Sequence, residues 1–338
     1  MQKKKIALAL QGGGSHGAYT WGILERLLEE DKFDIRGMCG ASSGAMNAAV
    51  ATYGLHTGGN KGAIDLLEKF WTHIGDGFKQ SLMQPSIFDG HKSPGGLEFS
   101  PGYHFVNFLS SILSPYDIDP ADTHTHYLKE LLVKLIDFKE LRNSKMQLFA
   151  SATNVLTSKP KVFNLSEMTV DTLLASAALP LMYKAVKIDG EFYWDGVYLC
   201  NPQIDPLIDF TDTKDVLILK VSPAIINTIP KTIQEIHNRI SQISLHASLM
   251  AEMRLLYFKN EMVDLGYNLN GKLRKVNFHE ISADFVLDDL SLTSKFNFSP
   301  EFLNLLRMRG RAETEKWLKG DAEYVGIEST LDIKSVFL

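Results

Sequence analysis

The sequence is poor in cysteine, has no long apolar run and carries no large excess of one charge. Its 338 residues include only two cysteines, Cys39 and Cys200, which excludes a disulfide framework and predicts reduced, buried thiols. No apolar segment approaches the length of a membrane span, so any membrane contact is expected to be peripheral. The 35 basic and 40 acidic residues give a formal net charge of -5, and the basic residues are scattered, which argues against a nucleic-acid partner.

The amino-terminal residues imitate a secretory signal without having its length. Three lysines, Lys3 to Lys5, precede a short apolar run that stops at Gln11. We therefore expect a cytoplasmic or peripheral membrane location. The composition, 45% hydrophobic and 22% charged, is that of an ordinary globular protein with a sizeable core.

The first chemical motif is a glycine loop between a predicted strand and a predicted helix. Residues 6–10 are continuously apolar, as in a buried parallel strand, and residues 18–30 have apolar side chains at helical spacing. The loop between them contains Gly12, Gly13, Gly14, His16 and Gly17. Glycines at the start of a helix can present backbone N–H groups to a negative charge. A phosphate-binding P-loop is excluded because no lysine closes this loop, whereas a dinucleotide site and an oxyanion hole both fit.

The second motif, Gly40-x-Ser42-x-Gly44, is typical of a nucleophile elbow, in which a strand turns sharply into a helix and projects a serine hydroxyl. A strand-like run at 35–39 precedes it and a small, apolar helical run at 45–53 follows. Ser42 is the candidate nucleophile, although the pattern also arises by chance in loops. A dinucleotide site would need an acidic residue where this strand ends, so the serine favours an oxyanion hole. The usual α/β-hydrolase order is excluded, because only one strand and one helix precede Ser42.

The segment 76–120 is rich in aromatic residues, glycine and proline. Such an insertion after a catalytic elbow predicts a lid or a lipid-contact surface, and an ordinary buried connection fits equally well. His124 and His126, which follow it, do not predict a metal site, because side chains two residues apart do not share a helix face.

The rest of the chain alternates between predicted strands and helices. We expect strands at 147–153, 215–221 and 273–281, and helices at 64–73, 127–136, 170–179, 229–265 and 300–319. Asp189-Gly190 predicts a hairpin turn, and from the residues alone Asp195 is also favoured as a turn residue. Asp284, Asp288 and Asp289 lack the glycine and spacing of a calcium loop and are expected on a solvated face.

The glycine loop, the serine elbow and Asp195-Gly196, in this order, resemble the patatin-like phospholipase family over roughly residues 6–220. The resemblance implies a three-layer α/β/α fold with a central, mostly parallel sheet. It also implies a catalytic domain at 6–220, with the candidate lid at 76–120, and a mainly helical extension at 221–338 packed on the core. By resemblance, Ser42 is the nucleophile and Asp195 its general base, which replaces the turn-only interpretation. The implied oxyanion loop is Gly12, Gly13 and Gly14, and the motif-supporting residues are His16, Gly17, Gly40, Gly44 and Gly196.

The activity implied by the resemblance is a lipid acyl hydrolase of phospholipase A or lysophospholipase type, acting through an acyl-serine intermediate. Its partner would be a lipid or a membrane-surface substrate, without nucleic acid, and neither a metal nor an organic cofactor is expected. Two departures from the family pattern stand out. His16 occupies a position where the family often has lysine or arginine, so any positive charge there would depend on pH, and Val197 occupies a position where glycine or alanine is common. The alternatives are a catalytically idle membrane-binding scaffold and, less favoured, a dinucleotide-binding protein.

Overall fold

The structure is a computed structural model that describes residues 3–89, 94–117, 124–226, 229–269 and 273–338. Its strands are β1 (Lys4–Leu10), β2 (Phe33–Gly40), β3 (Gln147–Asn154), β4 (Pro160–Asn164), β5 (Val186–Ile188), β6 (Glu191–Asp195), β7 (Asp215–Leu219) and β8 (Asn277–Ile281). Its α-helices are α1 (Gly17–Glu30), α2 (Ser43–Phe78), α3 (Pro101–Ile112), α4 (His124–Leu135), α5 (Phe138–Leu141), α6 (Val170–Ser176), α7 (Asp205–Phe210), α8 (Ile233–Asp264), α9 (Pro300–Lys319) and α10 (Ile333–Phe337). The short 3₁₀ turns nearest the site are η1 (Gly14–His16), η5 (Gly196–Tyr198) and η6 (Leu292–Phe296).

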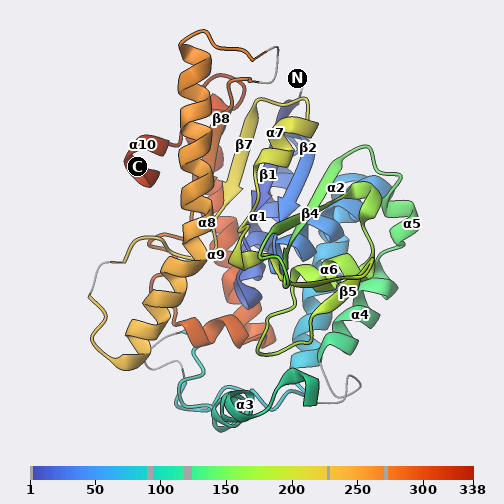
Figure 1. Cartoon of the computed structure of the whole chain (residues 1–338), viewed down its shortest axis with the longest axis vertical. Coiled ribbons are helices and arrows are strands. Elements are labelled where there is room, and N and C mark those ends of the chain that lie inside the picture. Colours follow the sequence, from blue (N-terminus) through green and yellow to red (C-terminus); the bar gives the residue numbers. More distant parts are fainter. Residues whose placement is uncertain (1–2, 90–93, 118–123, 227–228, 270–272) are drawn as a thin grey trace.

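One mixed sheet carries all of these strands, in the order β5-β6-β3-β2-β1-β7-β8, with β4 paired to β3 outside this path. Strands β3, β2, β1, β7 and β8 pair in parallel, whereas β4, β5 and β6 join by antiparallel pairing. The carboxyl ends of the parallel strands therefore lie along one edge of the sheet, the lower edge in Figure 1. In open parallel sheets this edge is where ligands and catalytic groups gather.

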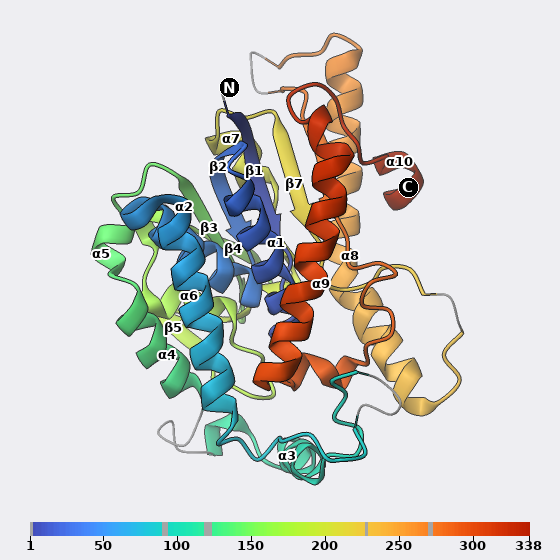
Figure 2. The ribbon, with the colours of Figure 1, turned by 180° about the vertical axis from the view of Figure 1, so that it is seen from behind.

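Helices cover both faces of the sheet, and the alternation along β1 shows why. Ile6, Leu8 and Leu10 belong to the core shared with α1, α2 and α9, while Ala7 and Ala9 belong to the core shared with α7, α8 and α10. Every second side chain of a strand points to the same face, so a continuously apolar strand needs cover on both sides. Figure 2 shows α1, α2 and α9 in front of the sheet, with α8 beyond it. The expected three-layer α/β/α fold with a mostly parallel sheet is confirmed.

The C-terminal region completes the sheet with β8 and contributes helices to both of its faces. The boundary expected near residue 220 falls between β7 and β8, which are hydrogen-bonded neighbours. Helix α9 packs closely against α1: a Cβ atom on Gly22 would lie 2.0 Å from the Arg307 carbonyl oxygen, and one on Gly310 would lie 2.1 Å from that of Tyr19. The Arg307 guanidinium also binds the Glu25 carboxylate through two N–H groups. The helix that follows the glycine loop is thus held in place from the far end of the chain.

The structure departs from the sequence expectations in a few places. The two helices expected at 45–53 and 64–73 form the single element α2, which kinks at Gly59 (φ 61°, ψ -157°). The helix expected to reach residue 179 ends at Ser176. The expectation of a solvated Asp284 is wrong, because its carboxylate accepts a 2.8 Å hydrogen bond from the buried ammonium of Lys220. Asp288 and Asp289 are exposed, as expected.

The segment 76–120 contains α3, which has no Asp, Glu, Lys or Arg and is largely exposed. Phe105, Phe108 and Ile112 on this helix are 53%, 60% and 61% exposed. Figure 1 places α3 beyond the carboxyl-end edge of the sheet. The side chains of His124 and His126 lie outside the described residues. In the described part of the chain, no helix combines the length and the apolar character needed to cross a membrane.

Candidate active site

Ser42 stands at the sharp junction between β2 and α2. Its backbone is in the left-handed region (φ 52°, ψ -126°), a strained conformation for a residue with a side chain. Its N–H donates to the carbonyl oxygen and to Oγ of Ser176, at 3.0 and 3.1 Å, which holds the junction. The Ser42 residue is only 8% exposed. The serine is thus fixed in an elbow at the carboxyl end of a central strand.

The two glycines of the elbow are required by close backbone packing. A Cβ atom on Gly40 would lie 2.4 Å from the carbonyl carbon of Gly44, and one on Gly44 would lie 2.3 Å from the carbonyl oxygen of Leu10. Both distances are far below van der Waals contact. The Gly-x-Ser-x-Gly spacing therefore follows from the contact between the first turn of α2 and the strands beneath it.

Asp195 is the last residue of β6 and lies opposite Ala152 of β3. Its N–H donates to the Ala178 carbonyl at 2.9 Å, and its Oδ1 accepts the Val197 N–H at 3.0 Å. Asp195 is 0% exposed, and its Oδ2 accepts no hydrogen bond of ordinary geometry from any described residue. Burial raises the pKa of this carboxyl to about 7, while the Val197 N–H and the nearby Ser42 hydroxyl oppose that rise. An Asp-Ser contact of imperfect geometry is common in free enzymes, where catalytic hydrogen bonds often tighten only when substrate binds.

The glycine loop joins the other two motifs. A Cβ atom on Gly12 would lie 2.9 Å from Cβ of Ser42 and 2.8 Å from Cγ1 of Val197. The structure therefore brings together three segments that are far apart in the sequence. Val197, one of the two departures from the family pattern, packs directly against this loop, and a Cβ atom on the neighbouring Gly196 would lie 2.2 Å from the Ser151 carbonyl oxygen.

The N–H groups of the loop are not equivalent. Gly12 donates to Oδ1 of the buried Asn201 at 2.7 Å, and Gly13 donates to Oγ of Ser43 at 3.1 Å. Gly14 (φ 62°) has no acceptor for its N–H among the described residues, and a Cβ atom there would lie 2.5 Å from the Lys295 carbonyl oxygen. Position 14 thus requires glycine for two reasons: its φ is positive, and the Lys295 carbonyl oxygen leaves no room for a side chain. Its N–H is the one most available to an incoming anion.

His16 does not carry the pH-dependent charge considered for it. Burial first, and then the nearby Lys295 ammonium, lower the pKa of its imidazole to about 3, so it is neutral near neutral pH. Oγ of Ser294 donates to the Ser291 carbonyl at 2.6 Å and therefore accepts from Nε2 of His16, at 2.8 Å. His16 is a structural link between the loop and η6. Gly17 is likewise tightly packed, since a Cβ atom there would lie 2.7 Å from Cβ of Ser43.

Four residues of the site were not predicted from the sequence. Ser43, Ser176, Asn201 and Lys295 each contact the elbow or the glycine loop. Asn201 is visible in the sequence only as the residue before Pro202, which indicates a turn and no more. Lys295 belongs to a region outside the resemblance, and no local pattern marks it.

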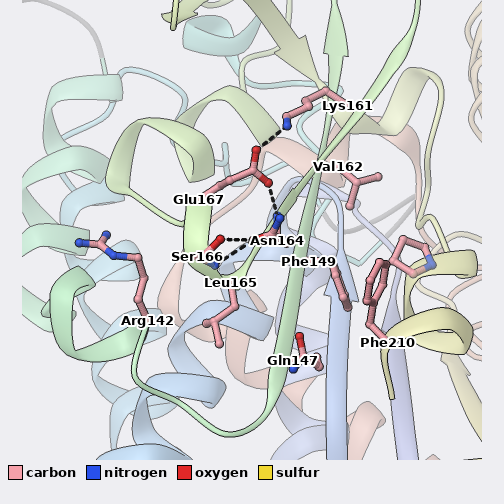
Figure 3. Close-up of a pocket in the computed structure, with 11 residues that line it drawn as sticks. Arg142, Gln147, Phe149, Lys161, Val162, Asn164, Leu165, Ser166, Glu167 and Phe210 are labelled. Atoms are coloured by element: carbon pink, nitrogen blue, oxygen red, sulfur yellow. Dashed lines mark hydrogen bonds and ion pairs between the residues drawn. The ribbon is translucent and has the colours of Figure 1, made fainter. Parts of the chain in front are cut away.

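A surface pocket of about 620 Å³ lies away from these groups (Figure 3). Residues of β3, β4 and α7 line it, together with Arg142 and the turn 165–167. Lys161 pairs there with Glu167 at 2.5 Å, and the Glu167 carboxylate also accepts the Asn164 N–H at 2.9 Å. Neither Ser42 nor Asp195 lines this pocket, so we assign it no part in the candidate chemistry. Across the described ranges, no three His, Cys, Asp or Glu side chains are grouped to hold a metal ion.

Comparison with known proteins is consistent with the resemblance drawn from the three motifs. A family model described as patatin-like phospholipase matches residues 8–208, more than half of the chain. No curated protein matches. Among solved structures, the chain is similar to VipD from Legionella pneumophila, at 14% identity and a TM-score of 0.45, covering 94% of this chain and 67% of that one. It is also similar to a chain of the complex of SpcU with ExoU from the type III secretion system of Pseudomonas aeruginosa, at 16% identity and a TM-score of 0.38, covering 94% and 54%.

Proposed function

Since the chain belongs to the patatin-like phospholipase family, we propose that it is a lipid acyl hydrolase that cleaves carboxylic esters through Ser42 and Asp195. The observation that carries this proposal is the position of Ser42. Its strained elbow (φ 52°) lies in contact range of a fully buried carboxyl and of a glycine loop with an unengaged N–H. The chain spans 67% and 54% of the two solved chains described above.

In the first step, Oγ of Ser42 attacks the ester carbonyl carbon and its proton passes to Oδ2 of Asp195. A pKa of about 7 makes this carboxylate a far better base than an exposed aspartate, because burial destabilises its charged form. The resulting tetrahedral oxyanion would be held by the N–H groups of Gly13 and Gly14. Gly12 is not proposed as a donor, because its N–H is engaged by Asn201.

In the second step, the tetrahedral intermediate collapses to an acyl-serine, and the leaving alcohol takes the proton from Asp195. A water molecule then gives a proton to Asp195 and attacks the acyl carbon; the bond from that carbon to Oγ of Ser42 breaks, Oγ takes the proton back from Asp195, and the carboxylic acid is released. Gly13 can serve as an oxyanion donor only if its N–H leaves Oγ of Ser43, a change that needs rotation of the Ser43 side chain about its Cα–Cβ bond.

The exposed apolar face of α3 would contact the lipid phase that contains the substrate. Helix α3 lies beyond the carboxyl-end edge of the sheet (Figure 1), the edge at which β2 ends shortly before Ser42, and it contains no Asp, Glu, Lys or Arg. It is linked to the site through η6: the rings of Tyr103 and Phe296 lie 6.2 Å apart, and the Leu97 N–H donates to Oγ1 of Thr293 at 2.9 Å. An apolar helix beside the site would place the enzyme on the lipid surface with the elbow facing it.

The proposed function is tested by hydrolysis of p-nitrophenyl esters of increasing chain length and of mixed phospholipid vesicles, without added metal. Ser42→Ala and Asp195→Asn should each remove turnover, whereas Ser166→Ala, at an exposed serine, should leave it unchanged. Labelling with a fluorophosphonate probe, followed by mass spectrometry, should modify Ser42 and not Ser166. Full esterase activity in Ser42→Ala would refute the mechanism. Vesicle binding without hydrolysis by the folded wild type would favour the scaffold alternative.

A further inference from the structure

The structure buries two lysines near the glycine loop, and they differ in their partners. The ammonium of Lys220 is 0% exposed and is matched by two carboxylates, Asp284 at 2.8 Å and Glu280 at 3.3 Å. Lys295 is 9% exposed, and its Nζ donates to Oγ of Ser222 at 2.9 Å. No carboxylate in the described residues pairs with Lys295. The charge of Lys220 is therefore balanced by neighbouring carboxylates, whereas that of Lys295 is not balanced by any described residue.

Lys295 and the residue before it, Ser294, both contact the glycine loop. Its carbonyl oxygen fixes Gly14, and the preceding residue, Ser294, accepts hydrogen bonds from Oγ of Ser15 (2.8 Å) and Nε2 of His16 (2.8 Å). Its hydrogen-bond partner Ser222 has its N–H bound to Oε1 of Gln11 at 3.0 Å. Residues 294 and 295 thus pack on the segment from Gln11 to His16, and the Lys295 ammonium is linked to Gln11 through Ser222.

A buried ammonium with no opposite charge is costly unless an anion joins it. Burial lowers the pKa of Lys295 to about 8, which still leaves the side chain mostly charged near pH 7. The neighbouring His16 cannot supply this charge, because it is neutral there. Among the described residues, this buried cation has no carboxylate partner, and its own residue packs on Gly14, whose N–H has no acceptor there; such a combination has the features of an anion site.

We propose that Lys295 supplies the positive charge for an oxygen anion bound at the glycine loop. This inference rests on the proposed function, whose reaction provides two such anions: the oxygen of the tetrahedral intermediate and the phosphate of a phospholipid substrate. In either case the C-terminal region contributes a residue to the site. Arginine or lysine within the loop itself is then unnecessary.

The kinetic test compares Lys295→Met, Lys295→Arg and the control Lys319→Met, whose native side chain is 73% exposed. The substrates are p-nitrophenyl butyrate, which has no phosphate, and monomeric dihexanoyl phosphatidylcholine. We expect Lys295→Met to lower kcat/KM by roughly 10- to 100-fold on the phospholipid, with partial recovery in Lys295→Arg. An equal loss on both substrates identifies the tetrahedral oxygen as the anion, and a loss confined to the phospholipid identifies the phosphate. A change below about twofold on both substrates, or an equal loss in the Met and Arg variants, would overturn the proposal.

A binding test separates this inference from the proposed function. Inorganic phosphate should raise the Tm of the wild type and of Ser42→Ala alike, but not that of Lys295→Met. If the wild type hydrolyses neither substrate, the proposed function fails while the phosphate-dependent Tm still tests Lys295. An identical phosphate response in the wild type and in Lys295→Met would reject the site.

Discussion

Replacing Asp195 by asparagine should remove activity and, above neutral pH, stabilise the protein. The carboxyl is fully buried, and burial raises its pKa from 3.8 to about 7. Because the pKa is higher in the folded protein than in the unfolded chain, the folded state binds this proton more tightly. Ionisation of Asp195 therefore lowers the free energy of unfolding progressively as the pH rises from about 4 to about 7.

The magnitude follows from the difference between the two pKa values. About three pKa units, at about 1.36 kcal/mol each, give a penalty of about 4 kcal/mol above pH 7, of which roughly 2 to 3 kcal/mol develops between about pH 5 and about pH 8. Asparagine keeps an oxygen that can accept the Val197 N–H, bound at 3.0 Å in the wild type, and it carries no charge. The variant should therefore escape the penalty at every pH.

The assay is urea unfolding of both proteins at about pH 5 and about pH 8, followed by circular dichroism. The stability of Asp195→Asn relative to the wild type should be greater at the higher pH by roughly 2 kcal/mol or more. Asp321→Asn, at an exposed aspartate, is the matched control and should show no such change. A relative stability of Asp195→Asn that is equal at both pH values would refute a buried carboxyl of raised pKa.

Three further predictions concern the base, the elbow and the lipid surface. First, kcat/KM on p-nitrophenyl esters should rise with pH through about 7, because only ionised Asp195 accepts the proton; a flat pH profile would count against it. Second, Gly44→Ala should lower stability by about 2 kcal/mol or more in thermal unfolding, because the new Cβ would lie 2.3 Å from a backbone carbonyl oxygen. Gly58→Ala is the control and should not lower it, because a Cβ there would meet nothing within 4 Å. Equal effects of the two substitutions would contradict the packing argument. Third, Phe108→Asp should lower vesicle hydrolysis by roughly tenfold and leave hydrolysis of a soluble ester unchanged. The control for it is Ile327→Asp, 70% exposed near the start of β8, and an equal loss in that variant would argue against α3 as the lipid surface.

The fold and the family were predictable because they rest on local patterns. The apolar run at 6–10, the glycine loop and the elbow each encode a strand, a turn or a helix start within a few residues. The resemblance to the patatin-like phospholipase family is confirmed by the match over residues 8–208. Assignment of Ser42 and Asp195 as catalytic groups stays a prediction, which the variants above test.

The remaining contacts of the site could not be predicted, because they join distant parts of the chain. Asn201 accepts a hydrogen bond from Gly12 across 189 positions, and Ser176 holds Ser42 across 134. No periodicity or turn pattern reports such pairs. The same reason explains Asp284: three aspartates in six residues suggest a solvated surface, and only the sheet reveals the Lys220 ammonium beside one of them.

Helix α1 packs against α9, and it is synthesised long before this partner helix. Helix α1 ends at residue 30 and α9 ends at residue 319, so nearly 290 residues are synthesised between them. At about 5–20 residues per second, a ribosome takes roughly 15–60 s to supply the partner helix. Until then the face of α1 that meets α9 has no native cover, and it is open to wrong association during synthesis.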